Sequence, residues 1–130
     1  GEVKDIPMRI PGFHNIENAL AAAALAMQVG VTGEEIKVGI ASFLGVKRRF
    51  EYHVESDEHV MIDDYAHHPT EIAACLNSVK ALYPGEKITA VFQPHLFSRT
   101  RDFIDDFATS LAIADELYLL DIYPARELPM

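Results

Sequence analysis

The sequence is poor in cysteine: only Cys75 occurs among its 130 residues. One thiol cannot form an intramolecular disulfide, so a small disulfide-stabilised secreted domain is excluded and a reducing compartment is favoured. The segment around Cys75 has helical spacing, and we expect this residue to be a small buried hydrophobe. The expected location of the protein is therefore the cytoplasm.

Positive charge is also scarce, because 11 Lys and Arg residues stand against 20 Asp and Glu residues, which leaves a net charge of −9. Nucleic-acid binding normally needs a basic face, so no nucleic-acid partner is expected. Long apolar runs are missing as well. The stretch 19–27 is apolar but far shorter than the ~20 residues of a membrane-spanning helix, and no secretory signal is recognised. No membrane partner is expected.

Several catalytic signatures are absent. Nothing matches the phosphate-binding loop GxxxxGK[ST], the zinc motif HExxH or the nucleophile motif GxSxG. His67, His68, Glu71 and His95 could supply metal ligands, but adjacent histidines point in different directions, so no metal site is predicted. If the chain uses ATP, its main phosphate-binding loop lies elsewhere.

The first third of the sequence contains the pattern of two helices. Asn15 predicts the N-cap of a helix that runs to about Gly30, which suits a left-handed C-terminal cap. Apolar residues surround this helix on almost all sides, a pattern typical of a buried helix. Thr32 and Glu35 form a capping box, which predicts a second helix over 33–44.

The small, basic stretch 45–49 marks a predicted domain boundary, with a helical part over 1–46 and a second domain over 47–130. After it, alternating apolar and polar residues at 50–55 and the apolar run 60–62 predict two strands paired in a hairpin. The two histidines in or beside this hairpin are expected to be solvated.

The remaining pattern is strand, helix, strand, helix, strand. Ile88 to Phe92 and Leu117 to Leu120 are continuous apolar runs, and helical spacing precedes each of them. Alternation of apolar strands with helices predicts an α/β fold, Rossmann-like, with a mostly parallel sheet.

Polar side chains follow three of the expected strands. These strand ends are residues 63–68, 93–95 and 121–123. Because the carboxyl ends of parallel strands lie at one edge of a sheet, we expect the three segments to line one ligand cleft. The arginines at 48–49 and 98–101 offer forked donors that suit phosphate or carboxylate. The second arginine segment fits equally well a solvated helix start with salt bridges to Asp102 or Asp105.

The ordered motifs together resemble those of the Mur ligases. They are HNIENALAA at 14–22, RRFE at 48–51, DDYAHHPTE at 63–71, QPHLFSRT at 93–100 and DIYPA at 121–125. The resemblance spans essentially the whole chain and is strongest to the members that join L-alanine to UDP-N-acetylmuramate. It implies that residues 1–46 end a central ATPase domain and that 47–130 form most of a C-terminal Rossmann-like domain.

The resemblance implies an ATP-dependent amide-bond ligase of peptidoglycan synthesis, in which the amine of L-alanine attacks an acyl phosphate of the muramoyl group. The nucleotide-binding residues that it implies are His14, Asn15, Asn18, Arg49 and Asp64. The first three would contact the adenine, Arg49 the γ-phosphate and Asp64 the ribose hydroxyls.

On the amino-acid side, the resemblance implies Tyr65, His67, His95 and Arg99 as substrate-binding residues. His67 and Arg49 are the implied catalytic residues, and catalysis would come chiefly from positioning and charge neutralisation. Leu96 stands where some relatives carry an arginine, so it is not counted as a site residue.

The resemblance also implies parts that these 130 residues do not contain: an N-terminal sugar-nucleotide domain, the rest of the central domain with its P-loop, and the ligands of Mg²⁺. The fragment alone is therefore expected to be inactive. Two alternatives stay open. One is the recycling ligase of the same family, which attaches a whole peptide to the same sugar. The other is a non-catalytic module with a nucleotide-binding cleft.

Overall fold

The computed structural model describes residues 4–128 and divides the chain into two compact units, unit 1 (residues 1–65) and unit 2 (residues 66–130). It contains helices, an antiparallel strand pair and a parallel strand pair, which confirms the predicted α/β class. Across residues 4–128, no helix is long and apolar enough to cross a membrane.

Unit 1 begins with helix α1 (Phe13–Gln28), whose start differs from the prediction. Gly12 holds the N-cap position, with φ of 104°, and no side chain caps the helix. The prediction that Asn15 is the N-cap is wrong, because the chain already turns into the helix at Gly12. Asn15 instead donates its side-chain amide to the Pro11 carbonyl at 2.7 Å.

The end of α1 follows the prediction. Gly30 has φ of 87° and donates to the Met27 carbonyl, while the Val31 N–H reaches back to Ala26. These two bonds form a Schellman motif, which needs a left-handed residue at the position of Gly30. The sequence therefore predicted correctly where this helix stops.

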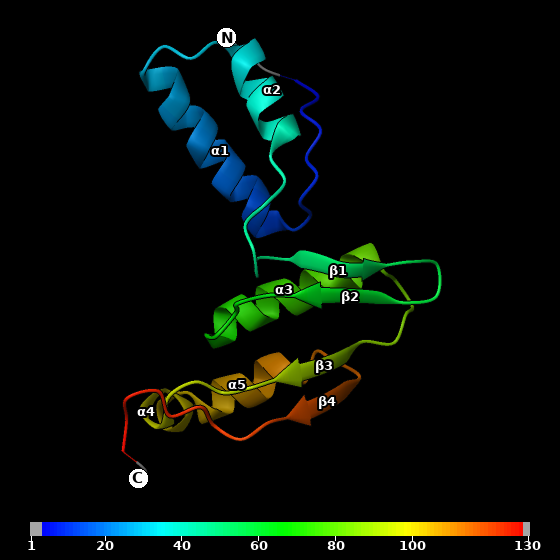
Figure 1. Ribbon diagram of the computed structural model, residues 1–130, viewed down its shortest axis with the longest axis vertical. Coiled ribbons are helices and arrows are strands. Elements are labelled where there is room, and N and C mark those ends of the chain that lie inside the picture. The colour runs from blue at the N-terminus through cyan, green and yellow to red at the C-terminus, as the bar shows by residue number, and fades with distance from the viewer. Residues whose placement is uncertain (1–3, 129–130) are drawn as a thin grey trace. The chain divides into compact units, whose positions relative to one another are not determined.

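Helix α1 is not a buried helix among the described residues. Helix α2 (Gly33–Ser42) lies beside it (Figure 1), but no residue of α1 is buried, and Leu25 is 71% exposed. The prediction of a buried helix is wrong here because one neighbouring helix covers only one side of α1. The capping box that starts α2 is confirmed: the Thr32 hydroxyl accepts from the Glu35 N–H, and Glu35 accepts from the Thr32 N–H.

The predicted hairpin is confirmed. Strand β1 (Glu51–Glu55) pairs antiparallel with β2 (Val60–Asp63), with Glu51 opposite Asp63, and the register shifts between Tyr52 and Val54 (Figure 1). Before β1, Phe50 is buried, and it packs edge-on against the ring of Tyr52.

Unit 2 contains the parallel strand pair. Strand β3 (Thr89–Phe92) lies beside β4 (Glu116–Leu119), in register from Thr89 opposite Glu116 to Phe92 opposite Leu119 (Figure 1). One part of the predicted sheet is wrong: β2 pairs with β1 and belongs to a separate two-stranded sheet. The short turn between β1 and β2 permits their antiparallel pairing, whereas parallel strands need a longer crossover connection.

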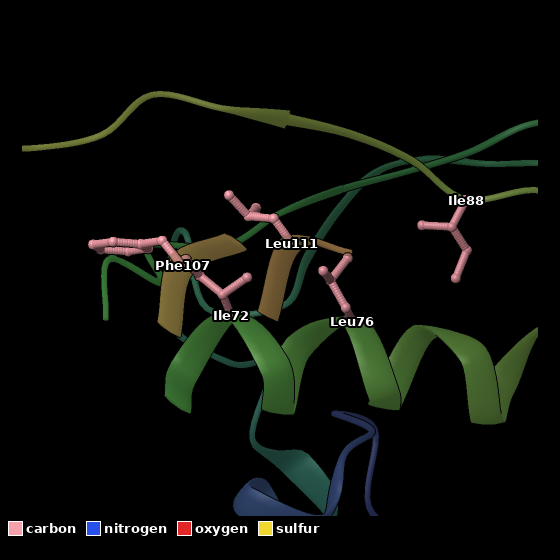
Figure 2. Packing of buried hydrophobic residues seen from close by; sticks show 5 residues of the cluster. All are labelled: Ile72, Leu76, Ile88, Phe107 and Leu111. Atoms are coloured by element: carbon pink, nitrogen blue, oxygen red, sulfur yellow. The ribbon is translucent and has the colours of Figure 1, made fainter. Parts of the chain in front are cut away.

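The core of unit 2 lies between helix α3 (Pro69–Leu82), helix α5 (Ile104–Leu111) and the start of β3. Figure 2 shows Ile72 and Leu76 pointing from α3 toward Phe107 and Leu111 of α5, with Ile88 beside them. Cys75, in the same helix, is half-buried rather than buried. These five apolar side chains are the packed centre of the unit.

The predicted helix after β3 is divided in two. Helix α4 (Phe97–Asp102) ends at Phe103, whose backbone leaves the helical region with φ of −121°, and α5 begins at the next residue. As a result, Phe107 and Leu111 are buried while Phe103 is 37% exposed. The break separates the apolar stripe of α5 from the arginines of α4.

Candidate functional site

Unit 1 contains a cavity of about 540 Å³. Its lining comes from α1, α2 and the segments before and after them: Met8, Arg9, Ile10, Asn15, Asn18, Ala19, Ala22, Gly39, Ile40, Phe43, Val46 and Arg49. Most of these side chains are apolar, with amides and guanidinium groups at a few points. Such a lining is typical of small-molecule sites, in which a few polar groups orient a largely apolar ligand.

Three of the residues predicted to bind nucleotide line this cavity together: Asn15, Asn18 and Arg49. A fourth, His14, has a buried Nδ1 atom with no hydrogen-bond partner among the described residues. A buried polar atom without a partner costs about 1–3 kcal/mol, so such atoms often mark a site where a ligand completes the bond. The structure thus brings Asn15 and Asn18 of α1 and the sequence-distant Arg49 to one cavity, whose lining does not include His14.

The two adjacent arginines before β1 have different surroundings. Arg48 and Phe50 both have left-handed φ values, 58° and 53°, and the Arg49 N–H donates to the Val46 carbonyl at 3.1 Å. This tight turn sends Arg49 to the cavity lining. Arg48 instead places its Nε atom 3.3 Å from Asp63, and its guanidinium lies 4.9 Å from the centre of the Tyr65 ring.

Asp64 and Tyr65 are held at the base of the hairpin. An Asp64 carboxylate oxygen accepts from the Phe50 N–H at 2.8 Å, and the Tyr65 N–H donates to the Arg48 carbonyl at 2.6 Å. The Tyr65 side chain remains 53% exposed. Both predicted site residues therefore have a structural contact that fixes their backbone next to the two arginines.

His53 lies between two carboxylates on the hairpin. Its Nε2 atom is 3.8 Å from an oxygen of Glu51 and 3.8 Å from one of Asp63. These three residues are the group in the described chain whose spacing could hold a metal ion. Both carboxylates already have donors, however, because Asp63 contacts Arg48 and Glu51 accepts from the Arg48 N–H at 2.7 Å. Each carboxylate therefore has at least one donor from Arg48.

In unit 2, part of the DDYAHHPTE segment caps helix α3. The His68 ring accepts from the Thr70 N–H, and Glu71 accepts from the N–H groups of His67 and His68 at 3.0 and 3.1 Å. Pro69 occupies the first helical position. Sequence reasoning missed this cap, although proline at the first position and Glu three residues after the cap are its usual signals.

Glu71 also contacts the ring of His67, with 3.4 Å between its carboxylate and Nδ1. Burial raises the pKa of Glu71, but the N–H of His67, the charge of His67 and the N–H of His68 together outweigh it. The pKa of Glu71 therefore lies below its ordinary value of 4.5, and the residue is ionised at neutral pH. An ionised Glu71 holds the predicted catalytic His67 from one side.

Two of the three predicted strand ends come together. His95 and Tyr123 form an isolated parallel bridge beyond β3 and β4, and their rings stack with 5.6 Å between centres. The Leu96 N–H donates to the Tyr123 carbonyl, and the Tyr123 N–H donates to Pro94. Tyr123 is a neighbour of the predicted site that we did not single out, although it follows an apolar strand as His95 does.

Arg99 lies in the first turns of α4, after these strand ends. Its Nη1 atom is buried and has no hydrogen-bond partner among the described residues. Arg101, in the same helix, forms a salt bridge with Asp102 at 2.7 Å. For this arginine, the alternative of a solvated helix start with a salt bridge is confirmed. The Nη1 atom of Arg99 lacks an acceptor among the described residues, and a carboxylate or phosphate oxygen is the kind of group that supplies one to a guanidinium.

The family profile described as "Mur ligase, glutamate ligase domain" matches residues 48–130. The UDP-N-acetylmuramate–L-alanine ligase of Flavobacterium johnsoniae is 59% identical over 128 residues, which make up 98% of this chain and 28% of that protein. The ligase of the same name from Porphyromonas gingivalis W83 is 53% identical over 130 residues, 100% of this chain and 28% of its own. The chain therefore spans little more than a quarter of these relatives.

Solved structures agree with this likeness. The UDP-N-acetylmuramate–alanine ligase of Thermotoga maritima has a TM-score of 0.77 at 37% identity, over 89% of this chain and 26% of its own. A folylpolyglutamate synthase of Mycobacterium tuberculosis, complexed with ADP, has a TM-score of 0.71 at 20% identity, over 90% of this chain and 25% of its own. The second likeness concerns the fold alone.

Proposed function

The chain belongs to the Mur ligase family, and from this premise we propose that the whole protein is an ATP-dependent ligase that joins L-alanine to UDP-N-acetylmuramate. Relatives of that name match almost the full length of the chain, which supports this substrate pair over the peptide-adding alternative. The proposed place of action is the cytoplasm, in peptidoglycan synthesis. The geometric observation that carries the proposal is the cavity of unit 1, lined by Asn15, Asn18 and Arg49.

In this proposal the cavity takes the nucleotide. The apolar lining of α1 and α2 suits the faces of an adenine ring, while the amides of Asn15 and Asn18 offer hydrogen bonds to its edge. His14, the residue before Asn15, is proposed as a third adenine contact although it is not part of this lining. Arg49 lines the same cavity and supplies positive charge for the γ-phosphate. Neutralising phosphate charge is the main protein contribution to phosphoryl transfer, which is why Arg49 is proposed as catalytic.

Asp64 is proposed to accept from the ribose hydroxyls. The hydrogen bond from the Phe50 N–H orients its carboxylate, and the same turn carries Arg49 one residue earlier. A carboxylate can accept several hydrogen bonds, because its two oxygens together carry about four lone pairs. The turn 48–50 would therefore place the phosphate-binding Arg49 close to the ribose-binding Asp64.

The proposed residues for the amino-acid substrate are Tyr65, His67, His95 and Arg99. Arg99 pairs with the substrate carboxylate, because its buried Nη1 atom has no partner among the residues described. His67 is held by Glu71, and His95 is stacked on Tyr123, so both rings have defined orientations. Rings held in this way can position an amine without rearrangement, which is the contribution expected of His67 as a catalytic residue.

Magnesium is proposed to act with ATP, but the cavity does not supply its ligands. The lining contains no carboxylate, and hard divalent cations prefer carboxylate oxygens. No step is therefore assigned to magnesium through the residues described. We propose that the ligands of magnesium, like the P-loop, lie in another part of the protein, and that these 130 residues alone are inactive.

The test is an assay of the full-length protein. Phosphate release should require ATP, UDP-N-acetylmuramate and L-alanine together, and a murein peptide should not replace L-alanine. Turnover with the peptide but not with L-alanine would indicate the recycling ligase. ATP binding by the 130 residues, with no turnover by the full-length protein, would indicate a non-catalytic module.

A further inference from the structure

We propose that Glu127 is a positioning residue for the amino-acid side of the ligase site. It holds the first turn of α4 and thereby determines where Arg99 presents its guanidinium. This inference rests on the proposed function, in which Arg99 binds the carboxylate of L-alanine.

Glu127 holds Ser98 with both oxygens of its carboxylate. One oxygen accepts from the Ser98 N–H at 3.0 Å, and the other accepts from the Ser98 hydroxyl. The hydrogen bonds from the hydroxyl and the N–H of Ser98 lower the pKa of Glu127 below its ordinary value, with further help from the Phe97 N–H and the charge of Arg101. The carboxylate is therefore ionised at neutral pH, which strengthens both bonds.

Helix α4 has no cap of its own. Leu96 occupies the N-cap position with φ of 73°, and its side chain makes no capping hydrogen bond. The first N–H groups of a helix need acceptors from outside the helix. Glu127 supplies such an acceptor from 29 residues further along the chain.

The route of the chain brings Glu127 to this place. After the bridge between His95 and Tyr123, a turn forms in which the Glu127 N–H donates to the Pro124 carbonyl at 2.9 Å. Ala125 within this turn has a left-handed φ of 53°. The segment that follows β4 therefore folds back onto α4.

Arg99 is the residue directly after Ser98. Its Nη1 atom is buried and has no partner among the described residues, so its position depends on the backbone that carries it. Loss of the Glu127 bonds would loosen the first turn of α4 and displace the guanidinium. A misplacement of about 1 Å in a substrate-positioning group can cost about a hundredfold in rate.

The experiment measures kinetics of the full-length enzyme with Glu127→Ala, Glu127→Gln and Ser98→Ala. Glu127→Ala should raise KM for L-alanine by about ten- to a hundredfold and leave KM for ATP and UDP-N-acetylmuramate within about twofold of wild type. Glu127→Gln keeps the shape and one acceptor oxygen, and should restore part of the loss. The double variant of Ser98 and Glu127 should resemble Glu127→Ala, because the two residues act as one pair.

The matched control is Glu116→Gln, which removes another half-buried carboxylate of unit 2, one that pairs with Lys87 at 2.8 Å. It should leave KM for L-alanine unchanged. Three outcomes would overturn the positioning role but not the proposed function. They are equal rises in all three KM values with Glu127→Ala, additive effects in the double variant, and no change in any KM value. If the wild-type protein shows no turnover that depends on L-alanine, the proposed function fails, and this inference fails with it.

Discussion

The two units of the chain differ in what their apolar side chains do. In unit 2, five apolar residues of α3, α5 and the position before β3 are buried against one another. In unit 1, α1 buries none of its residues and α2 buries only Ile36, but the two helices line a cavity of about 540 Å³. Unit 2 therefore has a packed core, whereas the helices of unit 1 leave most of their apolar side chains exposed or facing a cavity.

A Leu→Ala substitution in each unit tests this difference, and it has the largest expected effect. Leu111→Ala in unit 2 should lower the free energy of unfolding by about 2–5 kcal/mol, because Leu111 is 7% exposed within the core. Leu25→Ala in unit 1 should change it by less than about 0.5 kcal/mol, because Leu25 is 71% exposed. Urea unfolding of the chain measures both, and equal losses would contradict the comparison.

The adjacent arginines test whether the cavity carries the chemistry of unit 1. In the full-length protein, Arg49→Ala should lower kcat/KM for ATP by about 10²–10³, the usual loss for a group that stabilises developing charge. Arg48→Ala is the matched control and should have a much smaller effect, since its guanidinium contacts Asp63 and Tyr65. Steady-state kinetics decide, and an equal loss with both variants would remove the special role of Arg49.

The loss of a helix cap should lower the free energy of unfolding by less than the loss of a core side chain. Thr32→Ala removes the acceptor for the Glu35 N–H at the start of α2, and it should cost about 1 kcal/mol of unfolding free energy. Thr32→Ser keeps a hydroxyl at this position and should cost far less. Thermal unfolding compares the two variants, and equal losses would show that the methyl group rather than the cap matters.

The smallest effect concerns the pH dependence of the α3 cap in unit 2. The pKa of Glu71 is lowered in the folded chain, so its contribution is present above the ordinary value of 4.5 and is lost as pH falls through the lowered pKa. Its side chain is 51% exposed, so solvent screening limits the contribution to about 0.2–1 kcal/mol. Glu71→Gln should flatten the curve of stability against pH below 4.5. A curve identical to wild type would contradict the role of this cap.

Local signals predicted several elements because their causes lie within a few residues. The left-handed Gly30, the capping box of Thr32 and Glu35, and the hairpin of β1 and β2 each depend on neighbouring residues alone. Asn15 shows the limit of such reasoning. Its residue type suits an N-cap, but the backbone turns one helical turn earlier, at Gly12, and the amide is used as a donor.

The role of the candidate site residues stays a prediction. The resemblance indicated His14, Asn15, Asn18, Arg49 and Asp64 as a nucleotide-binding group, and three of them, Asn15, Asn18 and Arg49, line one cavity. The role of His68 and Glu71 in capping α3 was missed, because the density of titratable groups in DDYAHHPTE suggested chemistry for all of them. Several residues in this segment have a structural role, and one of them, Glu71, holds His67 in place.

The sequence by itself determined the family, the end of α1, the start of α2, the hairpin and the residue types offered to ligands, since these follow from short motifs and local propensity. Only the tertiary structure decided which strands share a sheet, that Arg48 and Arg49 have different surroundings, and that Glu127 caps a helix 29 residues before it. The physical reason is that these contacts join groups far apart in the chain or directed apart by one turn. Their energies depend on the path of the whole backbone, which no local pattern specifies.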